Sequence, residues 1–180
     1  MIKVDCLKRN CEIPFHCTTI FGKGVSSVID HVLVPTDGSE NAERAVRFSA
    51  QVADRRQQAV VTVVFVHLLV SPLATVGTLT PAPEQPLQDF SDEERTRAQD
   101  IVDRAVEEVR SLVTSPDVTV TGRVVVDSRA DEGILRVANE IDADIIVVGT
   151  RGLSTLRGAI MGSVSHALIE KARCPVLVVK

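Results

Sequence analysis

Unbroken apolar runs alternate along this chain with segments in which apolar residues recur every three or four positions. Short apolar runs rich in valine and isoleucine are typical of strands that are buried on both faces of a sheet. Such runs predict strands at 28–34, 60–66, 118–126, 144–148 and 175–179. In the third run, Val118, Val120, Gly122 and Val124 alternate with polar residues, which predicts one partly exposed face.

The segments between these strands have helical periodicity. Apolar residues at helical spacing predict helices at 40–56, 92–113, 128–141 and 162–172. Ser91 and Glu94 form a capping-box pattern at the start of the second helix, in which each side chain satisfies a free backbone N–H group. Asp37 and Ser39 are the N-cap candidates for the first helix.

The order of these elements predicts an α/β fold. Strands that alternate with helices are joined by right-handed crossovers into a mostly parallel sheet with helices on both faces. Ligands bind such sheets outside the carboxyl ends of the strands, where the strand order reverses. We expect strands 28–34 and 144–148 to flank that point, so residues 35–37 and 149–152 form the expected site.

Length and composition indicate one globular domain. The chain has 180 residues, of which 44% are hydrophobic and 24% charged, the balance of a soluble protein. Residues 1–27 show no hydrophobic period. We therefore expect a domain at 28–180 and a poorly ordered N-terminal extension at 1–27.

Cysteines are concentrated near the N-terminus, which does not fit a disulfide framework. Cys174, just before the last strand, is expected to be a small core residue. A cluster at the N-terminus has metal-ligand side chains but matches no common zinc spacing, so free thiols are the expected state. Its members are Cys6, Cys11, His16 and Cys17.

Charge and aromatic content narrow the class of partner. The net charge is −4 and the chain has neither Trp nor Tyr, so neither a phosphate-backbone binder nor a base-stacking platform is expected. The sequence contains no apolar run of about 20 residues and no secretory leader pattern, and we expect a cytoplasmic protein with no membrane partner.

A glycine-bounded segment between the fourth strand and the fourth helix carries the candidate chemistry. Gly149 and Gly152 follow the strand, and Gly162 and Ser163 begin the helix. Glycines let the backbone approach a ligand closely, and the first turn of a helix has free N–H groups and a positive dipole end. This arrangement predicts an anion site of the kind that holds phosphates, although glycines that serve only the turns are the alternative.

The same segment also carries a family resemblance. The spacing Gly149-x2-Gly152-x9-Gly162-Ser163 resembles the ATP-binding signature of the universal stress protein family. It contains neither a Walker loop nor a dinucleotide-binding fingerprint. Further segments resemble the opening strand and loop, the second-strand ending and the closing strand of that family: 32–40, 66–68 and 173–180.

The resemblance covers residues 28–180 and implies a Rossmann-like, doubly wound, five-stranded parallel sheet, an ATP cleft and a homodimer. By position, Pro35, Thr36 and Asp37 would line the adenosine side and Leu68 would pack on the adenine. The nucleotide-binding residues implied by the resemblance are Pro35, Thr36, Asp37, Leu68, Val148, Gly149, Thr150, Arg151, Gly152, Gly162, Ser163 and Val164. Arg151 and Arg157 would either reach the phosphates or lie in solvent.

Asp37 has more than one interpretation at this site. It could contact the nucleotide, cap the first helix, or hold Mg²⁺ or Mn²⁺ beside phosphate oxygens. His31 and His67 lie near strand ends, and a structural role is expected for each. No catalytic triad pattern or Walker lysine is present, so no catalytic residue is predicted.

The predicted function is therefore that of an ATP-binding regulatory or stress-response protein, whose occupancy sets its conformation or its partner. A slow ATP hydrolase and a nucleotide-independent dimeric interaction module are the alternatives. The apolar last strand lies at a sheet edge and predicts pairing with a second copy through Val176, Leu177, Val178 and Val179. The proline-containing segment 68–90 would serve as a lid or as a partner surface.

Overall fold

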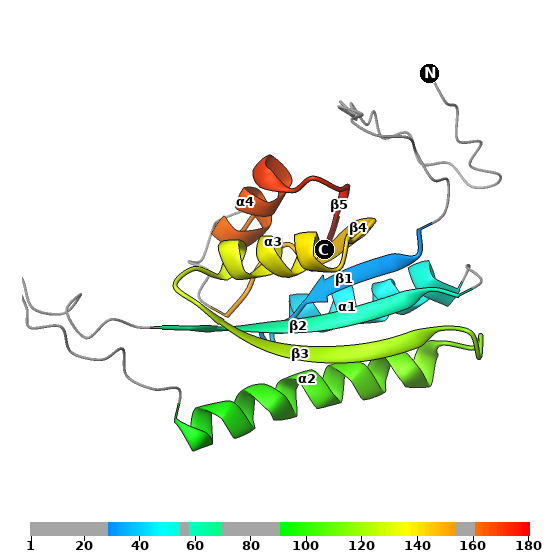
Figure 1. The fold of residues 1–180 in the computed structure, drawn as a ribbon, viewed down its shortest axis with the longest axis horizontal. Helices are drawn as coiled ribbons and strands as arrows, with labels where there is room; N and C mark the ends of the chain where they lie inside the picture. The colour runs from blue at the N-terminus through cyan, green and yellow to red at the C-terminus, as the bar shows by residue number, and fades with distance from the viewer. Residues whose placement is uncertain (1–28, 55–57, 70–90, 154–160) are drawn as a thin grey trace, which may run out of the picture.

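A computed structural model describes residues 29–54, 58–69, 91–153 and 161–180. Over these residues strands and helices alternate as predicted, and each lies within a few residues of its expected position (Figure 1). The elements are β1 (His31–Pro35), α1 (Glu40–Asp54), β2 (Val60–Leu68), α2 (Asp92–Leu112), β3 (Thr119–Asp127), α3 (Ala130–Glu140), β4 (Ile145–Gly149), α4 (Ser163–Lys171) and β5 (Val176–Val179).

The five strands form one parallel sheet in the order β3-β2-β1-β4-β5. The order reverses between β1 and β4, where Val32 pairs with Ile145 and Leu33 with Ile146. The doubly wound five-stranded α/β fold is therefore confirmed, and so is the pair of strands expected at the reversal.

Two hydrophobic cores lie on opposite faces of this sheet. Figure 1 shows the helices that cover the two faces. Val32 and Val34 pack with α1 and α2 on one face, whereas Leu33 packs with α3 and α4 on the other. Successive side chains of a strand point to opposite faces, so a strand covered on both sides must be apolar at every position. This explains the unbroken apolar runs in the sequence.

Polar side chains fix the starts of the helices on the first face. Ser91 and Glu94 form the predicted capping box, with the Glu94 N–H group donating to Ser91 Oγ at 3.3 Å and the Ser91 N–H group to Glu94 Oε2 at 3.1 Å. At α1, Ser39 Oγ accepts from the Ala42 N–H group at 3.3 Å. Of the two N-cap candidates for α1, Ser39 is therefore the one that caps it.

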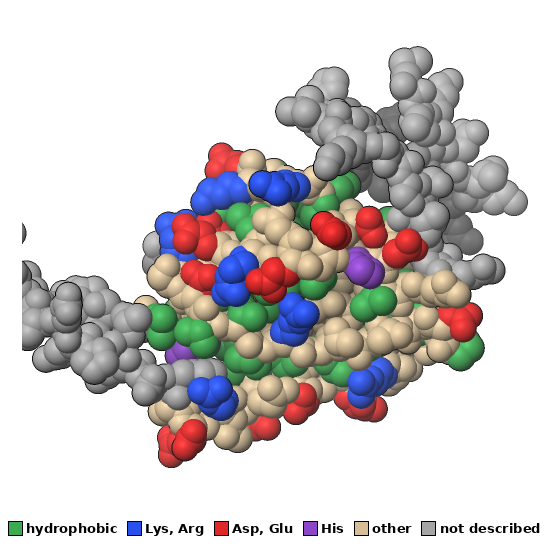
Figure 2. Space-filling view, in the orientation of Figure 1, with side chains coloured by type: hydrophobic (Ala, Val, Ile, Leu, Met, Phe, Trp, Pro, Cys, Tyr) green, Lys and Arg blue, Asp and Glu red, His purple; other side chains and the backbone are tan. Residues whose placement is uncertain are grey.

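The molecular surface carries mixed charges. Figure 2 shows acidic and basic side chains interspersed over the face that bears α3 and β3, without a large patch of one sign.

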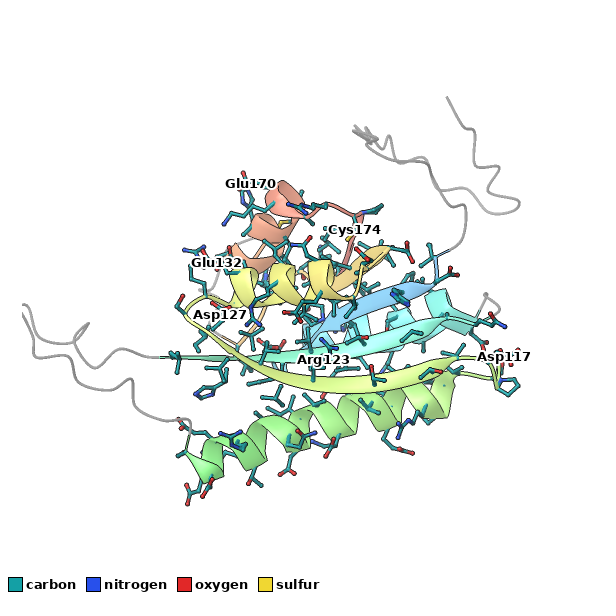
Figure 3. All side chains as sticks on the ribbon, viewed as in Figure 1. Asp117, Arg123, Asp127, Glu132, Glu170 and Cys174 are labelled. Carbon is teal, nitrogen blue, oxygen red and sulfur yellow. The ribbon has the colours of Figure 1, made fainter. Side chains whose placement is uncertain are left out.

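Cys174 is half-buried against the second core, where burial raises the pKa of its thiol, as expected for a core cysteine (Figure 3). In the described part of the chain, no helix is both long enough and apolar enough to cross a bilayer.

The end of β4 lies very close to the first turn of α1. Gly149 is buried, and a Cβ atom placed on it would lie 2.6 Å from the backbone oxygen of Asn41. Real Cβ atoms do not approach backbone that closely, so only glycine fits between this strand and this helix. Packing of α1 on β4 therefore accounts for Gly149, whatever binds nearby.

We expect Gly149→Ala to lower the free energy of unfolding by about 1–3 kcal/mol, because the added methyl group overpacks the contact with α1. Urea denaturation would measure this loss. Gly162→Ala is the matched control, since its Cβ atom would lie 3.4 Å from the Thr150 oxygen, a much milder contact. Equal midpoints for the two variants would contradict this explanation of Gly149.

Candidate functional site

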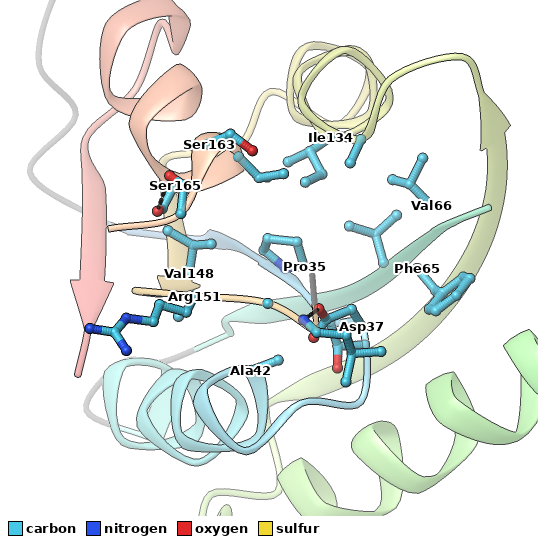
Figure 4. A pocket seen from close by; sticks show the side chains of 18 of the residues that line it. Pro35, Asp37, Ala42, Phe65, Val66, Ile134, Val148, Arg151, Ser163 and Ser165 are labelled. Atoms are coloured by element: carbon cyan, nitrogen blue, oxygen red, sulfur yellow. Dashed lines mark hydrogen bonds between the residues drawn. The ribbon is translucent and has the colours of Figure 1, made fainter. Parts of the chain in front are cut away.

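A pocket of about 410 Å³ opens at the carboxyl edge of the sheet, where β1 and β4 end and α4 begins (Figure 4). It lies at the reversal of strand order, which is the position expected for a ligand site in a doubly wound sheet. All but one of the residues predicted from the sequence line it: Pro35, Thr36, Asp37, Leu68, Val148, Gly149, Arg151, Gly152, Gly162, Ser163 and Val164.

Thr150 is the exception and joins two backbone segments instead. Its N–H group donates to the Val179 carbonyl at 2.9 Å, and its own carbonyl accepts from the Gly162 N–H group at 2.7 Å. The Ser165 hydroxyl lies 3.1 Å from the same Thr150 oxygen. Thr150 thereby connects the end of β5 to the start of α4 and fixes the edge of the pocket.

Asp37 holds together the two loops that form the floor of the pocket. Its Oδ1 accepts from the Ser39 N–H group at 3.0 Å, and its Oδ2 accepts from the Leu153 N–H group at 2.8 Å. A Cβ atom on Gly152 would collide with the same Oδ2 atom. Gly152 is therefore the residue that allows the loop after β4 to reach the carboxylate.

The polar side of the pocket is the first turn of α4. Gly162 is the N-cap residue, and the first intrahelical bond runs from the His166 N–H group to the Gly162 carbonyl at 3.1 Å. The N–H groups of residues 163–165 precede that bond and have no acceptor among the described residues. These free donors, the exposed Ser163 side chain and the helix dipole together make this side of the pocket favourable to an anion (Figure 4).

The apolar side of the pocket comes from β2 and α3. Phe65 and Val66 contribute from the end of β2, and Ile134 contributes from α3 (Figure 4). None of the three was predicted from the sequence, because Phe65 and Val66 belong to an apolar run and Ile134 to the apolar face of a helix, and both patterns are typical of core residues. Leu68, which the resemblance assigned to the adenine, also lines the pocket and is 44% exposed.

The backbone of β2 is also exposed toward this side. Pro35 is the last residue of β1 to pair with β2, opposite Val64, but β2 continues beside β3 to Leu68. The Val64 carbonyl faces β1 and accepts from the Thr36 N–H group at 2.9 Å. By the alternation of a parallel ladder, Val66 directs its N–H and C=O groups to the same side, where no described strand lies.

The family model for universal stress proteins matches residues 29–180. The chain belongs to the universal stress protein family. This confirms the resemblance carried by the glycine spacing and by the three flanking segments, and it places the matched region within one residue of the expected domain start at 28.

Relatives of this universal stress protein come from several organisms. A universal stress protein of Thermus aquaticus is 31% identical over 83% of this chain and 97% of that protein. The stress response protein NhaX of Bacillus subtilis is 28% identical over 84% of this chain and 98% of that protein. The structure of the Archaeoglobus fulgidus universal stress protein in complex with dAMP is 25% identical and matches with a TM-score of 0.58, over 84% of this chain and 98% of that one.

In this universal stress protein the described lining of the pocket contains a single carboxylate. Asp37 is the one carboxylate among the described residues that line it, and both of its oxygens already accept N–H groups. No group of three or more His, Cys, Asp or Glu side chains suited to a metal ion occurs in the described part of the chain. A metal-binding role of Asp37 stays a prediction from the sequence.

The remaining charged candidates are placed as follows. Arg151 lines the pocket, but its guanidinium group points away from it and toward β5 (Figure 4). His31 has the structural role expected of it, with Nδ1 2.5 Å from the Ile141 carbonyl oxygen, whereas His67 lines the pocket. Arg157, the cysteine cluster at residues 6–17 and nearly all of the segment 68–90 lie outside the described residues.

We expect Asp37→Asn to destabilise the protein by about 1–3 kcal/mol, since the amide NH₂ group cannot accept one of the two N–H groups that the carboxylate holds. Hydrogen exchange at the Leu153 or Ser39 amide should accelerate, and denaturation would give the change in free energy. Asp117→Asn is the control, because the exposed Asp117 carboxylate at the far end of β3 makes no such contact among the described residues (Figure 3). Unchanged exchange at both amides would refute the bridging role of Asp37.

Proposed function

We propose that this chain binds an adenine nucleotide, ATP in particular, in the pocket between β1 and β4, and that occupancy regulates its conformation or its partners during a stress response. The observation that carries the proposal is the meeting, in one pocket, of an apolar wall with N–H groups of the first turn of α4 that have no acceptor in the described part of the chain. The complex of the Archaeoglobus fulgidus relative with dAMP supports the same class of ligand.

The apolar side fits a purine base. Val66 of β2 and Ile134 of α3 offer apolar surface on which a base could pack (Figure 4). Ligand pockets are typically lined by apolar side chains with a few polar groups that orient the ligand. The N–H and C=O groups of Val66 form an adjacent donor and acceptor. The Watson–Crick edge of adenine presents the complementary pair, its N1 acceptor and its N6 amino donor.

The α4 side fits the phosphates. Free N–H groups at a helix N-terminus donate to phosphate oxygens, and the dipole adds a favourable potential. The Asp37 carboxylate keeps its negative charge, but its two oxygens are turned to the N–H groups of Ser39 and Leu153, whose dipoles offset part of its repulsion of an anion. The volume of about 410 Å³ lies in the range of pockets that hold small ligands.

We propose binding rather than turnover, because the described lining consists mainly of apolar side chains and backbone N–H groups suited to hold a ligand. The carboxylate of Asp37 is occupied by two backbone donors, so the described lining offers no carboxylate that is free to act as a general base. Release of phosphate from ATP above a protein-free control would favour the alternative function, that of a slow ATP hydrolase.

The decisive variant is Ser163→Asp. A carboxylate at the first turn of α4 should raise the stability of the protein by about 0.3–1 kcal/mol through the helix dipole. It should also weaken ATP binding at least about tenfold by repelling the phosphates. Calorimetric titration with ATP, together with urea denaturation, measures both effects.

Ser163→Asn is the matched neutral control and should bind ATP nearly as the unmodified protein does. Adenosine lacks phosphates, so its affinity should be the same in both variants. Failure of the unmodified protein to bind ATP would refute the proposal and favour the nucleotide-independent module. Equal ATP affinity in the Asp and Asn variants would show that the phosphates do not bind at the first turn of α4.

We also propose that the chain forms a homodimer through β5. All four residues of β5 are half-exposed at a sheet edge, and exposed apolar edges favour strand pairing. The opposite edge is guarded, because Arg110 Nη2 donates to the Val120 carbonyl at 3.1 Å and Arg136 Nη2 to the Val126 carbonyl at 3.2 Å. Antiparallel pairing of two β5 strands about a two-fold axis would cover the open edge.

Val178→Pro should yield a folded monomer by light scattering. The Ile146 N–H group bonds the Pro175 carbonyl and the Thr150 N–H group bonds the Val179 carbonyl, so Val178 directs its own N–H group outward, and proline there removes a donor that β4 does not use. Val124→Pro, at the outward position of β3, is the control and should stay dimeric. A monomeric unmodified protein at micromolar concentration would refute the dimer.

A further inference from the structure

Helix α4, which carries the proposed phosphate-binding turn, is weakly anchored by packing. It has nine residues, of which only Ser165 and Leu168 are buried. Helix α3 beside it has eleven residues and buries five of them, Asp131, Gly133, Ile134, Val137 and Ala138. Short helices are marginally stable without tertiary contacts, so the position of α4 depends on a few specific interactions.

One of these interactions is an ion pair at the end of α4 that lies away from the pocket lining. Lys171 Nζ, in the last turn of α4, lies 2.9 Å from Asp131 Oδ2, in the first turn of α3. The residues are 40 apart in sequence. The Asp131 side chain is only 7% exposed, whereas that of Lys171 is 47% exposed.

The carboxylate of Asp131 has a second cation. Arg129 reaches it with Nε 3.1 Å from Oδ1 and Nη2 3.0 Å from Oδ2. Burial alone would raise the pKa of Asp131, but the hydrogen bonds and charges of Arg129 and Lys171 outweigh burial and hold that pKa below its usual value. Asp131 is therefore ionised at neutral pH and remains paired with Arg129 if Lys171 is lost.

The ion pair joins the two helices that wall the pocket on one face of the sheet. Ala130 and Ile134, the neighbours of Asp131 on α3, line the apolar side, and the first turn of α4 lines the anionic side. Helix α4 is held at its start by the bond from the Gly162 N–H group to the Thr150 carbonyl, and at its end by Lys171. Losing the second restraint would leave Leu168 and the contacts of the first turn to hold α4, and the end of the helix would be less tightly fixed against α3.

We propose that the Lys171–Asp131 ion pair is a latch that fixes α4 against α3 and so sets the strength of phosphate binding in the pocket. This inference rests on the proposed nucleotide function. Lys171 is a positioning residue, since it is not among the residues that line the pocket. Its side chain is partly exposed, so a modification that neutralises the amine, or an anion that binds it, would open the latch.

The test compares Lys171→Met with Lys171→Arg, which keeps the charge. Titrations with ATP and with adenosine separate the two sides of the pocket. We expect Lys171→Met to weaken ATP binding about three- to tenfold and to leave adenosine binding within about twofold, because adenosine is held by β1, β2 and α3. Lys171→Arg should restore ATP binding.

Arg123→Met is the matched control. It removes another ion pair of α3, the 3.3 Å contact of Arg123 on β3 with Glu140 at the opposite end of that helix (Figure 3). Hydrogen exchange in the nucleotide-free protein gives a readout that needs no ligand. The amides of residues 166–171 should exchange faster in Lys171→Met than in Arg123→Met.

The outcomes separate this inference from the proposed function. An unmodified protein that binds no ATP would refute the function, and the exchange comparison would still decide whether the latch restrains α4. Equal exchange and equal ATP affinity in Lys171→Met and the unmodified protein would overturn the latch. Equal losses of ATP and adenosine affinity in Lys171→Met would also overturn the latch. They would show that the ion pair stabilises the whole pocket and not the phosphate-binding turn in particular.

Discussion

The pairing of β1 with β4 is the constraint on which the rest of this molecule depends. The chain leaves β1 toward α1 on one face of the sheet, and it leaves β4 toward α4 on the other face. Two adjacent parallel strands whose continuations diverge must leave a crevice at their carboxyl ends. The pocket, the bridge made by Asp37 and the close approach of α1 to β4 are all consequences of that divergence.

Much of the fold could be predicted from the sequence because burial on both faces leaves a simple signature. The apolar runs and helical periods placed every element, and the glycine spacing located the polar side of the pocket. The apolar side of the pocket could not be predicted in this way, since Phe65, Val66 and Ile134 are apolar like the core residues beside them in the sequence. The backbone role of Thr150 could not be predicted for another reason: its main-chain N–H and C=O groups make the contacts, which side-chain identity does not reveal.

Glycine and aspartate in the pocket loops also show how structural and binding roles coincide. Gly149 is required by the backbone of Asn41, and Gly152 by the carboxylate of Asp37. Each looked from the sequence like an adaptation to a ligand. Glycines at this spacing are therefore needed first for the close packing of strand, loop and helix. They affect the ligand indirectly, because this packing shapes the crevice that would hold it.

The guanidinium groups of Arg110 and Arg136 on the outer carbonyls of β3 have a consequence for how sheets of this protein can grow. A sheet with two open edges can add molecules at both ends and lengthen into a fibre. Here one end is occupied by side chains of the same molecule. Association through β5 would therefore favour a pair over a fibre, because two sheets joined there expose edges on which two of the outward carbonyls are already occupied.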